Sequence, residues 1–191
     1  MRGAEVGEPF SWKVERDGEW LRVALRGEID ENADFSELHA ALRGNVELSL
    51  EGITRINSCG VREWVNFVRG LDAVRALWFA RCSPPVVLQL NTIYNFRGRA
   101  RVSSFMAPYV CEACHGDEYK LLDVAEHFVD PIGHSARHSL AGGDSARSAR
   151  VADWHAHVPA FRCRRCGGVM VFDELPERYL SFLSEVELAD R

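Results

Sequence analysis

The residues with the clearest chemistry are four cysteines arranged as two Cys-x-x-Cys pairs. Cys111 and Cys114 form the first pair, and Cys163 and Cys166 form the second, which two glycines follow. A pair at this spacing can turn both sulfurs toward one metal ion, and two pairs supply the four thiolates of a tetrahedral zinc site. Because four thiolates leave no position for water, the spacing predicts structural Zn²⁺ rather than catalytic Zn²⁺.

The first pair alone has two other interpretations. The stretch Cys-Glu-Ala-Cys-His at 111–115 is also the attachment motif of c-type haem, and Cys-x-x-Cys is also the motif of redox dithiols. Haem attachment of this kind requires export, and the N-terminal residues contain no apolar core such as a signal peptide needs. The second pair favours a metal ion over both alternatives.

Positive charge surrounds the second pair. Arg162, Arg164 and Arg165 flank its cysteines. Cations here offset the excess negative charge of four thiolates around one divalent ion. The same arginines have a second interpretation, as contacts for the phosphates of a nucleic acid. A formal net charge of −5 gives no general attraction to nucleic acid, so we expect charge compensation.

Composition limits the class of protein. The chain of 191 residues is 47% hydrophobic and 27% charged, as is typical of folded proteins. Its longest apolar runs are too short to span a bilayer, so we expect no membrane partner. Without a visible signal peptide we expect a cytoplasmic location, where cysteines stay reduced and available to a metal.

The first half of the chain alternates strand and helix patterns. We expect strands at 20–27, 46–50, 75–82 and 101–110, and helices at 34–44, 60–71 and 83–93. An Asp-Gly turn at 17–18 predicts a further strand before these, antiparallel to the first. This order predicts an α/β fold with a mixed sheet and packed helices over residues 1–108.

From residue 109 the pattern is that of a small module. An apolar stretch at 169–173 follows the second cysteine pair, as a strand does in a zinc ribbon. Residues 131–150 are rich in Gly, Ser, Ala and Arg, so we expect a flexible insertion there. The last residues have helical apolar spacing and predict a C-terminal helix. We therefore expect a zinc-ribbon module over residues 109–191.

The turn before Gly60 is a second candidate site. The helix expected after it has an apolar stripe, with Arg62 and Glu63 facing outward. Phe67 falls outside this stripe, so we expect an exposed aromatic residue. A helix N-terminus lowers the pKa of a thiol, which opens a thiol-based sensor or enzyme at Cys59 as an alternative. Catalysis also needs a base, and none stands nearby in the sequence.

Three stretches carry a resemblance to a known family. They are "LRGEID" at 25–30, "VELSLEGITRINSCG" at 46–60 and "RCSPPVVLQL" at 81–90. In order and spacing, residues 10–108 resemble the STAS domain, the fold of anti-sigma-factor antagonists and of cytosolic domains on sulfate transporters. The resemblance implies a protein that binds a partner through the loop at 54–60 and the helix after it.

In antagonists of this family, a partner kinase phosphorylates a hydroxyl residue in an Asp-Ser-Ser/Thr-Gly motif at this turn. A thiol stands at the acceptor position here, and Ser58 is the remaining hydroxyl and candidate phospho-site. The resemblance implies a kinase-type regulator or another signalling component as partner. The residues that it implies for binding are Asn57, Ser58, Cys59, Gly60, Arg62 and Glu63.

We therefore expect a non-enzymatic cytosolic adaptor or regulator that binds another protein. Two alternatives remain at this stage. One is a nucleic-acid-binding regulator that uses the arginines of the zinc ribbon, and the other is the thiol-based sensor or enzyme.

Overall fold

The computed structural model describes residues 7–128 and 158–185. The chain forms two compact units, Met1–Met106 and Ala107–Arg191. The boundary expected from the sequence lies two residues later, after residue 108. The predicted flexible insertion at 131–150 lies outside the described residues.

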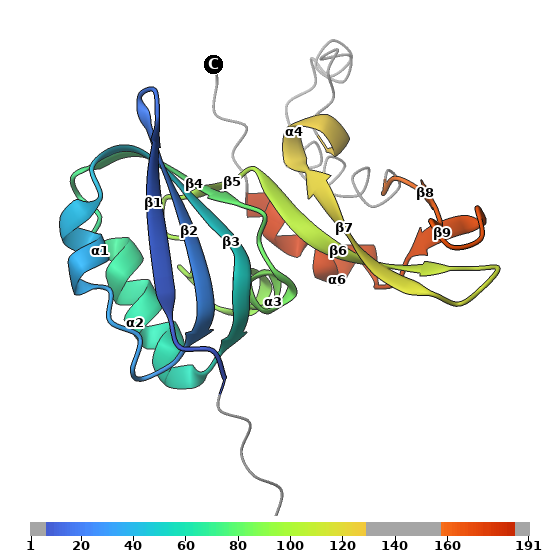
Figure 1. Cartoon of the computed structure of the whole chain (residues 1–191), viewed down its shortest axis with the longest axis horizontal. Coiled ribbons are helices and arrows are strands. Elements are labelled where there is room, and N and C mark those ends of the chain that lie inside the picture. The colour runs from blue at the N-terminus through green and yellow to red at the C-terminus, as the bar shows by residue number, and fades with distance from the viewer. Residues whose placement is uncertain (1–6, 129–157, 186–191) are drawn as a thin grey trace, which may run out of the picture. The chain divides into compact units, whose positions relative to one another are not determined.

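The first unit is a mixed sheet packed with helices (Figure 1). Its elements are β1 (Ser11–Asp17), β2 (Trp20–Ile29), α1 (Ser36–Ala41), β3 (Gly44–Ile56), α2 (Ser58–Arg69), β4 (Val74–Ala80), α3 (Pro84–Thr92) and β5 (Arg101–Val102). The strands lie side by side in chain order, with β1 antiparallel to β2 and the others parallel. The predicted mixed α/β architecture with packed helices is confirmed.

One face of this sheet forms the core. Along β2, buried Val23 and Leu25 alternate with residues that are exposed or partly exposed, as the period of two predicts. The Trp64 ring of α2 lies 5.6 Å from the ring of Phe79 on β4. Its indole N–H donates to the Phe96 carbonyl oxygen at 2.9 Å, so this buried polar group is satisfied. These contacts place α2 over the buried face of the sheet.

β3 is longer than the sequence predicts. It runs from residue 44 to residue 56 rather than from 46 to 50. Its second half pairs with the end of β2, where Arg26 lies opposite Gly52 and Ile29 lies opposite Ile56. Because residues 54–56 belong to this strand, the expected loop at 54–60 is wrong. Only Asn57 separates β3 from α2.

The helix starts differ in detail from the expected ones. The Asp34 carboxylate accepts the N–H of Ser36 at 2.8 Å, although the helix itself begins at Ser36. α3 begins after Ser83 as expected, with prolines in its first turn. The Ser83 hydroxyl does not cap this helix but donates to the Ile53 carbonyl oxygen at 2.7 Å. α2 begins at Ser58, two residues earlier than expected.

The second unit is built around a small antiparallel arrangement. Its elements are β6 (Ser104–Cys111, which begins in the first unit), β7 (Asp117–Asp123), α4 (Val124–His127), β8 (Phe161–Arg162), β9 (Val169–Phe172), α6 (Pro176–Tyr179) and the 3₁₀-helix η3 (Ser181–Glu185). The strand order is β7-β6-β9-β8. The expected C-terminal helix is present only as a short piece, because α6 ends at Tyr179 and a 3₁₀-helix follows.

Apolar contacts hold this unit together. The Tyr109 ring lies 5.0 Å from the ring of Phe161 and 5.7 Å from that of Phe172. The Tyr109 hydroxyl donates to the Pro159 carbonyl oxygen at 2.7 Å.

Within the described ranges, no helix has both the length and the apolar character needed to cross a bilayer.

Candidate functional site

The four cysteines of the two Cys-x-x-Cys pairs come together in the second unit. All four sulfurs lie within 4.8 Å of one another. The Cys111 and Cys166 sulfurs are 3.5 Å apart, and those of Cys114 and Cys163 are 3.7 Å apart. Cys111 ends β6, and its backbone pairs with Met170 of β9, which brings the two turns to the same end of the sheet. The predicted grouping is confirmed.

Backbone N–H groups favour negative charge at Cys111 and Cys163, whereas at Cys166 the Gly168 N–H is outweighed by the neighbouring sulfurs, which raise the pKa to about 12. The N–H of Arg165 points at Cys163 Sγ from 3.4 Å, and that of Gly168 points at Cys166 Sγ from 3.4 Å. The N–H groups of Arg165 and Cys166 lower the pKa of the Cys163 thiol to about 6. The N–H of Cys114 lowers the pKa of Cys111. Thiolate is the form that binds a metal.

The turn after the second pair has no room for a side chain. A Cβ on Gly168 would lie 2.9 Å from the Ala113 Cβ and 3.2 Å from Cys111 Sγ. The two turns therefore approach each other closely through this glycine. Four sulfur donors in one cluster suit a thiophilic ion in tetrahedral geometry. The cluster is thus able to hold one metal ion.

The arginines near the cluster differ in their contacts. Arg162 donates to the Gly167 carbonyl oxygen at 3.3 Å. Arg164 lies 3.6 Å from the Glu118 carboxylate, and its side chain is 84% exposed. The Arg165 side chain lies beside Gly116, where one of its nitrogens is 3.0 Å from the position that a Cβ would take. These contacts lie within the second unit and involve a carbonyl oxygen and a carboxylate, so charge compensation at the sulfurs stays a prediction.

The start of α2 is fixed by Asn57. Its side-chain oxygen accepts the N–H of Gly60 at 2.8 Å, and its side-chain amide donates to Glu31 at 2.8 Å. This amide lowers the pKa of the Glu31 carboxyl. The backbone N–H of Asn57 donates to the Ile29 carbonyl oxygen at 3.2 Å. One residue therefore caps the helix and ties it to the end of β2.

The residues expected to bind a partner fall into two groups. Gly60 is buried, and a Cβ there would lie 1.9 Å from the Ile29 carbonyl oxygen. It is a packing residue that lets α2 approach β2. Ser58 and Cys59 are exposed in the first turn of α2. Arg62 is exposed as well and pairs with Glu63, nitrogen to oxygen, at 3.1 Å. We call Ser58, Cys59, Arg62 and Glu63 the helix-start surface.

The imidazole nearest in sequence to Cys59 lies elsewhere in the fold. His39 Nε2 is 2.7 Å from the carbonyl oxygen of Gly70, just after the last residue of α2. Since a carbonyl oxygen only accepts, Nε2 carries the proton. Cys59 is in the first turn of the same helix, so His39 is not placed to act as its base.

Phe67 corrects a further expectation. It is only 5% exposed, not an exposed aromatic residue. Its ring stacks on Phe35 with the centroids 4.6 Å apart and the planes at 20°. The segment leading into α1 supplies Phe35, so the buried arc of α2 is wider on this side than helical periodicity alone indicates.

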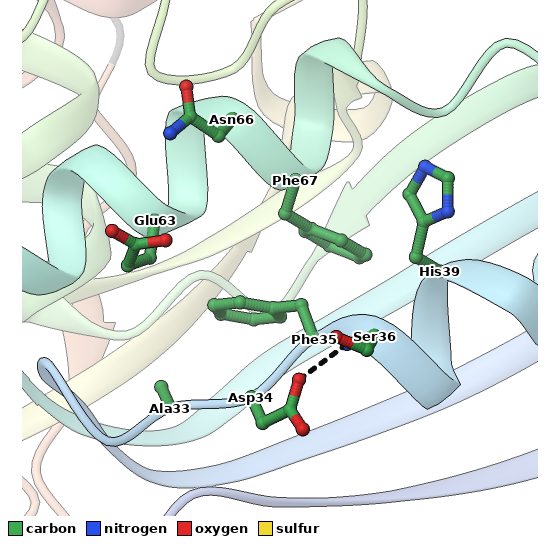
Figure 2. Close-up of a pocket in the computed structure, with 8 residues that line it drawn as sticks. All are labelled: Ala33, Asp34, Phe35, Ser36, His39, Glu63, Asn66 and Phe67. Carbon is green, nitrogen blue, oxygen red and sulfur yellow. Dashed lines mark hydrogen bonds between the residues drawn. The ribbon is translucent and has the colours of Figure 1, made fainter.

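A shallow groove of about 420 Å³ lies between α1 and α2 (Figure 2). No local pattern in the sequence indicates this groove, because its residues come from two helices and a loop. We call it the α1–α2 groove. It is lined by Ala33, Asp34, Phe35, Ser36, His39, Glu63, Asn66 and Phe67.

Comparisons with known proteins do not add to this geometry. No protein-family model matches the chain, and no curated protein matches its sequence.

Proposed function

We propose that the protein is a non-enzymatic cytosolic adaptor or regulator that binds a protein partner through the helix-start surface. The observation that carries this proposal is the rigid display of exposed side chains at the start of α2. Asn57 fixes this turn through hydrogen bonds to Gly60, Glu31 and Ile29. A surface that is ordered before binding loses little conformational entropy when a partner binds.

The positions of the STAS-like stretches support the same proposal. "LRGEID" runs from β2 into the following turn, and "VELSLEGITRINSCG" runs from β3 into α2. "RCSPPVVLQL" connects β4 to α3. This order of strands, turns and helices supports the resemblance. We therefore propose a STAS-like first unit whose docking turn has lost the usual acceptor hydroxyl to Cys59.

We propose Zn²⁺ as the ion of the cysteine cluster and a structural role for it. The four sulfurs use all the positions of a tetrahedral ion and leave none for a substrate. When bound, the metal would link the β6–β7 turn to the β8–β9 turn through Cys111, Cys114, Cys163 and Cys166. The second unit would then be a zinc ribbon that offers a rigid second surface.

Site-specific photo-crosslinking in the source cells tests the docking proposal. A benzophenone amino acid replaces Arg62 in the full chain, and in a control variant it replaces Lys13. Both side chains are well exposed, at 74% and 77%, but Lys13 lies on the edge strand β1. We expect a discrete crosslinked partner from position 62 and none from position 13. Equal crosslinks from both positions, or none from either, would contradict the proposal.

A further inference from the structure

The α1–α2 groove combines an aromatic floor with acidic walls. Figure 2 shows the stacked rings of Phe35 and Phe67 at its centre. Asp34, from the loop before α1, and Glu63, from α2, both line the same hollow. The amide of Asn66 adds a polar group on the α2 side. A volume of about 420 Å³ lies within the range of roughly 300–1,000 Å³ found for ligand pockets.

The charge of this groove is only partly balanced by the residues around it. Among the described residues, no cation lies within ion-pair distance of Asp34, whose carboxylate is hydrogen-bonded by the side chain and by the backbone N–H of Ser36. Glu63 pairs with Arg62, but this pair is exposed and therefore weak. Glu31 and Glu37 are exposed acidic residues near the same loop and helix. The groove thus has excess negative charge beside aromatic rings.

We propose that the α1–α2 groove receives an arginine side chain of the protein partner. A guanidinium is planar, so it can lie beside the small exposed parts of Phe35 and Phe67, 8% and 5% of each residue, while its N–H groups reach carboxylates at the rim. Asp34 and Glu63 supply those carboxylates from the two sides of the groove. A lysine would bring charge but no planar group, and an acidic or neutral side chain would leave the carboxylates without compensation.

This inference rests on the proposed function, since it names the partner group that the docking face would recognise. Glu63 belongs both to the groove and to the helix-start surface, so the two are continuous along α2. A partner that contacts Arg62 would have the groove within the same interface. The groove then provides specificity, because it selects a basic residue at one position of the partner.

Nuclear magnetic resonance of the ¹⁵N-labelled full chain tests the inference without a known partner. The probe is Nα-acetyl-arginine amide, and the matched control is Nα-acetyl-citrulline amide, which has nearly the same shape but no charge. We expect saturable shifts at Phe35, Glu63, Asn66 and Phe67 with a dissociation constant on the order of millimolar. The citrulline probe should bind at least several-fold more weakly, and added salt should weaken the arginine probe.

Two conservative variants and one control complete the test. Asp34→Asn keeps an acceptor oxygen for the Ser36 N–H, and Glu63→Gln keeps the side-chain shape. Each should weaken the arginine probe by about two- to fivefold, as loss of one exposed ion pair does. Glu37→Gln removes the same charge from the exposed side of α1, outside the groove, and should have a much smaller effect.

Three outcomes would overturn the inference. They are no saturable shift at the groove, equal binding of the citrulline probe, and equal effects of Glu37→Gln and Glu63→Gln. Photo-crosslinking at position 62 is independent of these results. If it captures a partner while the arginine probe fails, the docking proposal stands and the groove inference alone is wrong.

Discussion

The replacement Gly60→Ala tests how α2 is held against the sheet. A Cβ at this position would lie 1.9 Å from the Ile29 carbonyl oxygen and 2.4 Å from its carbonyl carbon. Backbone atoms cannot turn away as a side chain can. The start of α2 must therefore move until the first distance rises from 1.9 Å to at least 3.0 Å. Such a movement of about 1 Å also stretches the hydrogen bonds that Asn57 makes.

The free energy of unfolding should fall despite a favourable helix propensity. Alanine within a helix is favoured over glycine by about 1 kcal/mol. Overpacking against fixed atoms costs about 1–3 kcal/mol, and weakening the Asn57 cap costs about 1 kcal/mol more. The net expectation is a destabilisation of about 1–3 kcal/mol. A lower free energy of unfolding would therefore support the packing explanation, whereas helix propensity alone would raise it.

Urea unfolding followed by tryptophan fluorescence measures this change. Four of the five tryptophans, at positions 12, 20, 64 and 78, lie in the first unit, so the signal reports mainly on that unit. Cys59→Ala is the matched control, because it changes an exposed residue in the same turn and should alter stability by less than about 0.5 kcal/mol. A Gly60→Ala variant as stable as the parent protein, or more stable, would refute the reasoning.

Other variants test the remaining contacts. In the parent protein, the hydrogen bond from Asn57 to Glu31 stabilises the fold above the ordinary carboxyl pKa of 4.5 and is lost as pH falls through the lowered pKa. Asn57→Asp places a second carboxylate beside Glu31. The variant should therefore be less stable than the parent protein, with the greatest difference near pH 7 and a smaller one near pH 4. A difference in urea midpoints that does not change with pH would contradict this. Cys163→Ser should reduce bound metal from about one ion per chain to a small fraction, measured by elemental analysis, while Cys59→Ser keeps it. The tryptophan unfolding midpoint of the first unit should stay within error in both, and metal retained by the Cys163→Ser variant would count against the four-thiolate site. Iodoacetamide should alkylate Cys59 and spare buried Cys82 in the metal-loaded protein, as mass spectrometry can determine, and the opposite selectivity would contradict their burial.

Local patterns predicted the parts of the structure that depend on neighbours in the chain. The period of two at 20–27 predicted β2, and the prolines after Ser83 predicted the start of α3. The two Cys-x-x-Cys pairs predicted the sulfur cluster, because each pair needs only a local turn and two such turns together can supply four ligands to one metal ion.

Contacts between distant residues were not predictable in this way. The second half of β3 exists because β2 offers it hydrogen-bonding partners, which no pattern within 51–56 reveals. Phe67 is buried because Phe35 stacks on it. The bond between Asn57 and Glu31 joins residues that are 26 apart in sequence. Each depends on how separate elements pack, and so does the α1–α2 groove.

Hydrogen–deuterium exchange on the crosslink-identified partner complex tests the central claim most directly. The free chain and the complex are compared peptide by peptide, with the complex reconstituted from purified proteins. We expect slower exchange in residues 57–69, which include the helix-start surface, and little change in β1. Protection confined to the second unit, with α2 unchanged, would contradict it.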